Sequence, residues 1–567
     1  MAEAKKETAT QRVERLKREK NAWECMDEIR GFARNGFDSI PPEWLGTYFR
    51  AWGVYTQGDG AGAVGGVGGQ GKAVPYFMVR IRIANGFLNS EQAHAIADLI
   101  DKYGRGVADI TVRQNIQLHW VTIESLPEVF ESLWRVGLTT VGACGDVTRN
   151  IIGCPVAGVD RDAICDASPL VEEASKLFVG NGEFYNLPRK FKIAITGCRV
   201  WCSYPEINDI GLTATTRKRR TGEEVGFSLR VGGGLSTDPL FGQRLNAFVR
   251  WNQVLPVLKG VAEVFRDSNS LRENRERARL KFLFLRQGWN IDTFLSALEE
   301  RLGYRLDEAE PEEAPIDVLR DHVGYHEQIQ PGLGYIGASV LRGRITGAQL
   351  RTAAELAGRY GNGELRTTTM QNLVLLNIPK AYVGAVSDRL TLAGLPTEGS
   401  VFQRGTIACT GSEFCKLAIT ETKGFARWLT EDLDERLPGF EHQLRLHITG
   451  CPNSCGQHWI ADLGIEGKKL KVDGQLRDAY YFCVGGGVGK FQAFARPVGY
   501  RCLAAEVPEA IERLLTQFEL LRDGQENLRQ FLHRHDSDDI RSFLAGSVIS
   551  AVERDLPSGT VPHGVEG

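Results

Sequence analysis

The chain has 567 residues, more than one hydrophobic core accommodates, so several domain-sized units are expected. Its composition, 42% hydrophobic and 25% charged, is that of an ordinary soluble protein. The net charge of −3 gives no reason to expect binding to nucleic acid or to an anionic membrane, and no apolar stretch is long enough to predict a membrane span.

The N-terminal segment is expected to form a charged surface helix. Residues 1–30 carry many charges and lack the apolar run of a secretory signal. Four glutamates among the first nineteen residues also argue against an organelle transit peptide, which would be poor in acids. A cytoplasmic location is therefore predicted.

Two glycine-rich runs resemble nucleotide-binding motifs but are not expected to bind nucleotides. The run Gly66–Gly71 satisfies the dinucleotide pattern, yet an extended apolar segment follows it in place of a helix, which favours a flexible loop. The run Gly485–Lys490 lacks both the first glycine and the hydroxyl residue of a phosphate loop. Its successive N–H groups remain candidates for cradling a carboxylate.

The chain repeats itself at an interval of slightly more than 250 residues. The pattern Tyr-Gly-x-Gly with a following Gln-Asn occurs at 103–115 and again, at identical internal spacing, at 360–372. The motif Ile-Thr-Gly-Cys-x-x-x-Cys occurs at 195–202 and again at 448–455. A Val-Gly-Gly-Gly run repeats at the same interval. This period is far above that of solenoid repeats, so the sequence predicts a duplicated domain pair.

Each half is expected to begin with a small α+β unit, because short apolar strands flank amphipathic helical patterns. In the first half, Ser90 is a candidate N-cap for a helix that continues to about Tyr103. The cysteine and glycine motifs follow in the second part of each half. An acidic, proline-containing stretch near residues 307–315 predicts a linker between the halves.

Twelve cysteines are too few for a disulfide scaffold in a chain of this size, and paired cysteines in a reducing compartment more often serve metal or redox chemistry. Cys409 and Cys415 form a C-x5-C pair, and Cys451 and Cys455 form a C-x3-C pair. Four thiolates so arranged suit an iron–sulfur cluster. A zinc site and a set of inert core cysteines remain open on spacing alone.

The first half keeps only part of this pattern. Cys198 and Cys202 match the C-x3-C pair, whereas cysteines are missing at the expected positions of the other two ligands. A second cluster built from Cys154, Cys165, Cys198 and Cys202 is one reading. The other is that these cysteines are small buried hydrophobic residues.

The cysteine arrangement, the internal duplication and the length together resemble the family of siroheme-dependent sulfite and nitrite reductases. The resemblance extends from about Trp52 to about residue 545. It implies an internally duplicated α+β fold, with two ferredoxin-like half-domains and two α/β siroheme/4Fe-4S-type domains related by pseudo-two-fold symmetry. It also implies that Cys409, Cys415, Cys451 and Cys455 bind a [4Fe–4S] cluster, with Cys455 bridging the cluster to the siroheme iron.

The expected division of the chain is as follows: 1–74, N-terminal helical region and glycine-rich loop; 75–140, first ferredoxin-like half-domain; 145–303, first siroheme and substrate-binding domain; 304–334, linker; 335–400, second ferredoxin-like half-domain; 402–545, cluster and siroheme domain; 546–567, tail.

Basic residues of the first half are candidates for holding a small oxyanion and supplying its protons. Alternation along a strand would place Lys190 and Lys192 on one face, where solvated lysines are the competing reading. By resemblance to the family, Arg113, Arg149, Lys190 and Lys192 fall on substrate-site positions. The second repeat has different residues at the corresponding positions: Met370, Gly405, Gln443 and Arg445.

The resemblance implies six-electron reduction of a small oxyanion. Lys192 favours sulfite, the more highly charged anion, because nitrite reductases of the plant type tend to have Asn there. Nitrite reductase, or a dual nitrite and sulfite reductase, is the alternative. Ferredoxin is the expected electron donor, with a flavoprotein as the alternative, and the enzyme is expected to be a monomer.

Two readings from other classes compete with the enzyme. One is a plain iron–sulfur electron carrier, which leaves the basic residues without a role. The other is a zinc-stabilised binding protein, whose fold would depend on the metal. Neither accounts for the internal repeat.

Overall fold

The computed structural model describes residues 7–57, 74–220, 222–311, 315 and 319–546. The glycine run Gly66–Gly71 and most of the expected tail lie outside the described residues. Among the helices of the described part, none has the length and apolar character needed to cross a bilayer.

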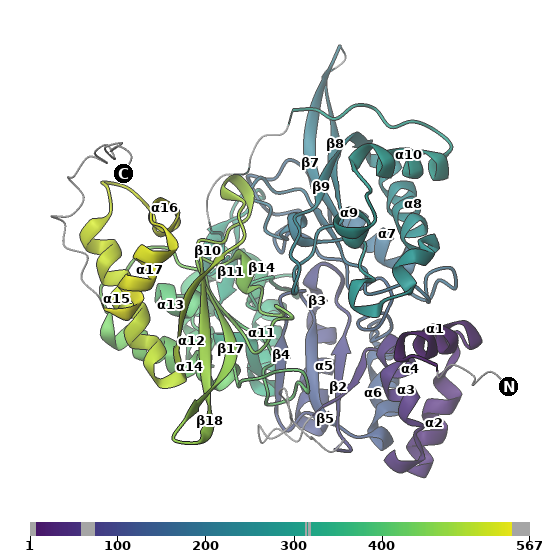
Figure 1. Ribbon diagram of the computed structural model, residues 1–567, viewed down its shortest axis with the longest axis horizontal. Coiled ribbons are helices and arrows are strands. Elements are labelled where there is room, and N and C mark those ends of the chain that lie inside the picture. The colour runs from purple at the N-terminus through teal and green to yellow at the C-terminus, as the bar shows by residue number, and fades with distance from the viewer. Residues whose placement is uncertain (1–6, 58–73, 221, 312–314, 316–318, 547–567) are drawn as a thin grey trace, which may run out of the picture.

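The chain folds into four β-sheets, arranged as two similar pairs (Figure 1). The first pair consists of two five-stranded sheets of the same design. In spatial order, one contains β1 (Val54–Thr56), β2 (Phe77–Ile81), β5 (Ile116–Val121), β4 (Val107–Ile110) and β12 (Arg344–Thr346). The other contains β10 (Gly324–Glu327), β11 (Leu333–Ala338), β14 (Leu373–Pro379), β13 (Glu364–Thr367) and β3 (Phe87–Asn89).

These two sheets exchange their edge strands. β12 from the second half pairs with β4, and β3 from the first half pairs with β13, both antiparallel. A single hydrophobic core contains residues of both sheets, such as Leu118 and Leu375. The halves are therefore joined by backbone pairing as well as by side-chain packing.

Helices α5 (Ser90–Tyr103) and α11 (Gly347–Tyr360) pack against each other, with α5 on the first sheet and α11 on the second. The N-cap of α5 is Asn89, one residue before the expected Ser90. The Asn89 side chain accepts the Gln92 backbone N–H, and the Gln92 side chain returns to the Asn89 backbone, which forms a capping box. The hydroxyl of Ser90 donates instead to Ala354 O at 2.9 Å, which ties α5 to α11. Helices α6 (Leu126–Arg135) and α12 (Val383–Leu392) also pack on this core.

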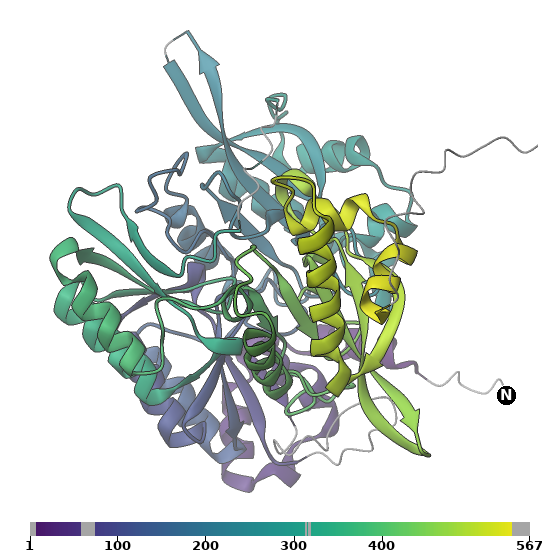
Figure 2. The ribbon, with the colours of Figure 1, turned by 90° about the vertical axis from the view of Figure 1, so that its left-hand side faces the viewer.

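The second pair of sheets carries the cysteine motifs. One contains β6 (Ile193–Thr196), β7 (Ile210–Arg219), β8 (Gly222–Val231) and β9 (Gln243–Arg250). The other contains β15 (Thr406–Ala408), β16 (Leu446–Thr449), β17 (Leu463–Val472), β18 (Gln475–Val484) and β19 (Arg496–Leu503). In both, a short buried strand pairs in parallel with the first arm of a long antiparallel hairpin. The two hairpins project from opposite ends of the molecule (Figures 1 and 2).

Helices cover each of these sheets and form a separate core with it. The first has α7 (Ser168–Phe178), α8 (Val254–Asp267), α9 (Phe282–Arg286) and α10 (Ile291–Leu302). The second has α13 (Val401–Gly405), α14 (Lys423–Arg436), α15 (Val507–Leu521), α16 (Leu528–Arg534) and α17 (Ser537–Ala545).

The repeated glycine runs serve close packing, and the expected carboxylate contact is met in part, because Gly489 donates its N–H to Glu206 Oε1 at 2.7 Å. The N–H groups of Gly485, Gly486 and Gly487 all donate to backbone carbonyls of the protein. A Cβ at Gly486 would lie 2.5 Å from Trp459 O, so a side chain there has no room.

The N-terminal region forms α1 (Ala9–Glu19), α2 (Met26–Asn35), α3 (Pro42–Gly46) and α4 (Tyr48–Ala51). Helix α1 is not merely a surface helix, because two of its charged residues are buried against the first half. Lys17 lies 3.5 Å from Asp146, and Glu14 accepts from Arg272 at 2.8 Å. Burial of paired charges fixes the position of α1 on the first siroheme-type domain.

Candidate active site

The four predicted cations come from three adjacent loops at the end of the first half. Arg113 lies in the tight turn between β4 and β5, which Thr111 closes by donating its N–H to Asn115 O at 2.9 Å. Arg149 lies in the loop that pairs with Phe191, through its N–H donating to Phe191 O at 2.7 Å. Phe191 is part of the core, and the lysines on either side of it are half-buried.

Lys190 and Lys192 thus share one face, as alternation along the chain predicts. They lie in the extended segment just before β6, and not within the strand itself. The backbone N–H of Lys192 donates to Asp209 Oδ2 at 2.8 Å, which fixes this segment against the start of β7.

The structure brings these cations close enough to repel one another. Burial, followed by Arg279, lowers the pKa of Lys190 to about 7. Burial, followed by Arg113, lowers the pKa of Lys192 well below its ordinary value. For Arg113, burial and then Arg149 lower the pKa to about 9. Such a concentration of buried positive charge is costly unless an anion lies among the cations.

The nearby carboxylate of Asp209 does not neutralise the positive charge of this cluster. Asp209 is fully buried and accepts from Arg279 at 2.8 Å, so its charge is already paired. Arg113 and Arg149 direct several of their N–H groups to backbone carbonyls: Arg113 Nη2 lies 2.5 Å from Asn150 O, and Arg149 Nε lies 2.9 Å from Gly145 O. These contacts fix the two guanidinium groups without cancelling their charge.

Two further arginines belong to this site and were missed in the sequence. Arg82 is buried on the strand-like segment after β2, and burial followed by Arg149 lowers its pKa to about 9. Arg279 holds Asp209, and in the second half Arg529 holds Asp462 in the same way, at 3.0 Å. The duplicated Asp-x-Gly motif was visible, but its partners lie about 70 residues further along the chain and carry no local pattern.

The four predicted cluster cysteines lie at one end of the second half. Cys409 follows β15 directly, whereas Cys451 and Cys455 lie in the loop after β16. Cys409 Sγ accepts the Gly450 N–H at 3.2 Å. Burial, followed by Cys455, raises the pKa of both Cys409 and Cys415, the latter to about 11.

The spacing of these thiols fits a multi-iron cluster better than a single metal ion. All four residues are described, and no three of their sulfur atoms lie within 4.8 Å of one another. A cluster binds each thiolate through a different iron, so its ligands stand further apart than those of one tetrahedral ion.

The cluster cysteines and the cations meet across the two halves. Cys455 is exposed, unlike Cys451, and it is among the groups that influence the pKa of Lys190. The basic cluster of the first half therefore faces the cysteine end of the second half. Cations on one side and a cysteine on the other suit a cofactor with several carboxylates, such as siroheme.

Three of the four corresponding positions of the second half carry no cation, whereas Arg445, at the place of Lys192, keeps a buried one. Met370 replaces Arg113, and its sulfur accepts from the Tyr204 hydroxyl at 3.2 Å. At Gly405, a Cβ would lie 1.8 Å from Leu444 O, so no side chain equivalent to Arg149 fits there. Gln443 binds the Leu319 N–H through its side chain. The two halves have therefore diverged in the charge that they place at these positions.

Comparison with known proteins agrees with this duplicated architecture. The nitrite and sulphite reductase 4Fe-4S domain matches residues 144–306 and 402–545. The nitrite/sulfite reductase ferredoxin-like half domain matches residues 70–135 and 326–393.

Curated relatives span nearly the whole chain. An assimilatory ferredoxin-dependent nitrite reductase of Haloferax mediterranei is 37% identical, over 91% of this chain and 90% of the relative. A ferredoxin sulfite reductase of Mycobacterium tuberculosis is 35% identical, over 93% of this chain and 95% of the relative.

A solved structure shows the same fold. The structure of the Mycobacterium tuberculosis NirA protein superposes with a TM-score of 0.88 at 34% identity, covering 93% of this chain and 97% of that one. The predicted duplicated α+β fold is confirmed, and so is the predicted cofactor pair of siroheme and a [4Fe–4S] cluster. The chain is an oxidoreductase and belongs to the family of siroheme-dependent nitrite and sulfite reductases.

Proposed function

We propose that this enzyme reduces sulfite to sulfide with six electrons from ferredoxin, and that nitrite is its alternative substrate. The observation that carries the choice is the pair Lys190 and Lys192, held on one face beside the half-buried Arg113 and the buried Arg149. A second ammonium group stabilises a dianion more than a monoanion. Relatives named for either activity differ little in identity, 37% for a nitrite reductase and 35% for a sulfite reductase, so the choice rests on the site.

We assign the anion to the first half and the cluster to the second. Arg113, Arg149, Lys190 and Lys192 would bind the oxyanion, whereas Cys409, Cys415, Cys451 and Cys455 would hold the [4Fe–4S] cluster. Siroheme would lie between them, with Cys455 as the ligand shared with the cluster. This division is supported by Cys455, which is exposed and opposes the lowering of the Lys190 pKa by burial and Arg279.

The side chains of the first half supply binding and protons. Reduction of one sulfite ion to hydrosulfide consumes six electrons and seven protons and releases three water molecules. The bound siroheme and cluster supply the electrons. The pKa of Lys190, about 7, is close to neutral pH. This lysine is therefore suited to donate a proton and then to take another from solvent. Arg149 keeps its charge: burial lowers its pKa, but Tyr55, Cys144 and Asp146 outweigh burial and raise the pKa above its ordinary value. Its fixed guanidinium fork would orient the anion.

The location, oligomeric state and electron donor of the enzyme are part of the proposal. We propose a cytoplasmic monomer that receives electrons from ferredoxin, with a flavoprotein as the alternative donor. All twelve cysteines are free, in agreement with a reducing compartment.

The substrate is tested by steady-state kinetics on anaerobically purified enzyme, with reduced methyl viologen as a donor that bypasses the protein partner. Wild type is expected to have a higher kcat/KM for sulfite than for nitrite. In Lys192→Asn, kcat/KM for sulfite should fall about 100-fold, the usual effect of removing one charged donor. The value for nitrite should fall much less.

Lys218→Asn is the matched control, because Lys218 is an exposed lysine in the β7–β8 hairpin. It should leave both values unchanged. A wild-type enzyme that prefers nitrite, or a Lys192→Asn variant that loses both activities equally, would contradict the choice of sulfite.

A further inference from the structure

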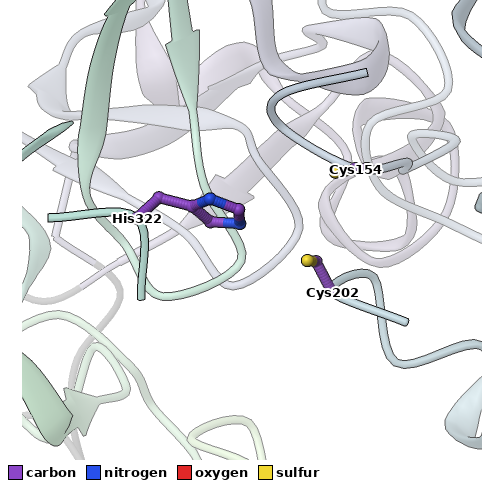
Figure 3. A group of neighbouring side chains, drawn as sticks. All are labelled: Cys154, Cys202 and His322. Atoms are coloured by element: carbon purple, nitrogen blue, oxygen red, sulfur yellow. The ribbon is translucent and has the colours of Figure 1, made fainter. Parts of the chain in front are cut away.

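The cysteines of the first half form a compact group with a histidine from the segment that joins the two halves. The sulfur atoms of Cys154 and Cys202 and a ring nitrogen of His322 all lie within 4.8 Å of one another. Figure 3 shows the His322 ring directed toward the sulfur of Cys202. Cys198 extends the group, because its sulfur lies 3.5 Å from that of Cys202. All four residues are buried.

The pseudo-symmetry identifies this group as the counterpart of the cluster cysteines. Gly153 donates its N–H to Gln114 Oε1 at 3.2 Å, and Ala408 donates to Gln371 Oε1 at the same distance. Gln114 and Gln371 occupy equivalent places in the repeat. The next residues, Cys154 and Cys409, are therefore equivalent.

The fourth cysteine of the repeat has been replaced. Six residues after Cys154, at the position equivalent to Cys415, stands Asp160, which forms an ion pair with Arg320 at 2.6 Å. His322 follows two residues after that arginine and enters the group in place of the missing thiol. Cys165, the alternative fourth ligand in the sequence, is not part of this group.

We propose that Cys154, Cys198, Cys202 and His322 bind one structural zinc ion. Tetrahedral zinc–sulfur bonds of about 2.3 Å place neighbouring sulfur atoms about 3.8 Å apart. The sulfur atoms of Cys198 and Cys202 lie 3.5 Å apart, and the ligand atoms of Cys154, Cys202 and His322 all lie within 4.8 Å of one another. Cys198 Sγ lies more than 4.8 Å from at least one of these three atoms, so this side chain would move inward to complete the tetrahedron. The second-half cysteines are more widely spaced, so the two sets suit different metal centres.

The two ring nitrogens of His322 have the environments expected of a metal ligand. Its Nε2 is buried and has no hydrogen-bond partner in the part of the chain that the structure describes, whereas its Nδ1 lies 3.5 Å from the Tyr335 hydroxyl. Metal-bound histidines commonly present one nitrogen to the ion and the other to such a partner. A Cβ at Gly337 would lie 1.6 Å from His322 O, so the glycine there is required for the position of His322.

The surrounding contacts hold the two sides of the site together. Ile329 donates its N–H to Val159 O, and the Gln330 side chain donates to Gly158 O, both at 2.9 Å. An apolar shell that includes Val156 and Val374 surrounds the cysteines. Bound zinc would thus link the loop of the first half to the segment that leads into the second half.

The test is metal analysis of untagged protein purified without added chelator, combined with X-ray absorption at the zinc edge. We expect about one zinc per chain, with about three sulfur ligands at 2.3 Å and one nitrogen ligand at 2.0–2.1 Å. The variants Cys198→Ser and His322→Ala should lose zinc and keep the iron content of the wild type. Cys165→Ser, which changes a neighbouring cysteine outside the group, should keep both metals.

Three results would overturn the proposal. The first is wild-type protein that contains iron but no zinc and does not take up added Zn²⁺ after reduction. The second is a Cys198–Cys202 disulfide, detected by mass spectrometry in native protein. The third is a loss of iron from the Cys198→Ser variant, which would indicate an iron centre in the first half. Because zinc and iron are counted separately, failure here leaves the proposed reductase activity untouched.

Discussion

At the scale of single residues, Cys455 differs from the other thiols of its set because it is exposed. It lies at the end of the second half that faces the cations. There it partly offsets the lowering of the Lys190 pKa by burial and Arg279. A cysteine in this position can bind a cluster on one side and leave the other side open to the substrate end of the site. The remaining thiols are more enclosed and suit ligands that serve the cluster alone.

This predicts a specific effect of removing the Cys455 thiol. The Cys455→Ser variant is expected to lose most of its cluster iron and its viologen-dependent activity, since a hydroxyl is a poor ligand for iron–sulfur clusters. Iron content and the visible spectrum of anaerobic protein measure the loss. Cys483→Ser is the control, because Cys483 is buried in β18 away from the set, and it should keep the iron. Wild-type iron content in Cys455→Ser would contradict the assignment.

At the scale of elements, helix α1 is docked through Asp146. This buried carboxylate pairs with Lys17 of α1, with Arg275 at 2.5 Å, and with Arg189, the residue before Lys190. Burial alone would raise the pKa of Asp146, but Arg275, Lys17 and Arg189 together bring it well below its ordinary value. One carboxylate thus connects the N-terminal helix to the segment that carries Lys190 and Lys192.

Asp146→Asn is therefore expected to reduce the free energy of unfolding by about 3 kcal/mol at pH 7, because it leaves buried cations unpaired. The ionised Asp146 makes its full contribution to the free energy of unfolding above about pH 5. This contribution is lost as the pH falls, because the carboxyl of the unfolded chain then binds a proton that the folded one does not. Urea unfolding at pH 7 and pH 3 measures this: the gap in the free energy of unfolding between wild type and variant should narrow by about 1 kcal/mol at pH 3, because an unfolded aspartate has a pKa of about 3.9. Asp98→Asn, at an exposed ion pair with Arg351, should change stability by less than about 1 kcal/mol. An equal gap at both pH values would contradict the role of ionised Asp146.

Part of this architecture could be predicted from the sequence, because it resides in local patterns. The duplication and the shared face of the lysines around Phe191 follow from spacing and alternation along short segments, whereas the assignment of the cluster cysteines stays a prediction from the family resemblance. The exchange of β3 and β12, the entry of His322 into the first-half cysteine group and the docking of α1 depend on contacts between segments far apart in the chain. Arg82 was missed because an arginine in an apolar strand gives no sign of its partners until the loops around it are placed.

At the scale of the whole molecule, the exchanged edge strands make the two halves mutually dependent. Leu88 of β3 pairs with Leu365 of β13, and both are fully buried in the core that the two ferredoxin-like sheets share. A first half alone would lack β12 at the edge of its sheet and would leave the α5 face uncovered. Exposed strand edges and apolar faces of this kind promote aggregation.

A chain divided into residues 1–311 and 312–567 tests this dependence. The first fragment expressed alone is expected to be insoluble or to unfold without cooperativity, because its largest core is completed by the second half. The two fragments expressed together should copurify as a one-to-one complex, since β3–β13 and β4–β12 pairing and α5–α11 packing need no covalent link. Size-exclusion chromatography and thermal unfolding distinguish these outcomes. A soluble 1–311 fragment with its own sharp unfolding transition would show that the halves fold independently, and strand exchange would then serve only to align the two faces of the active site.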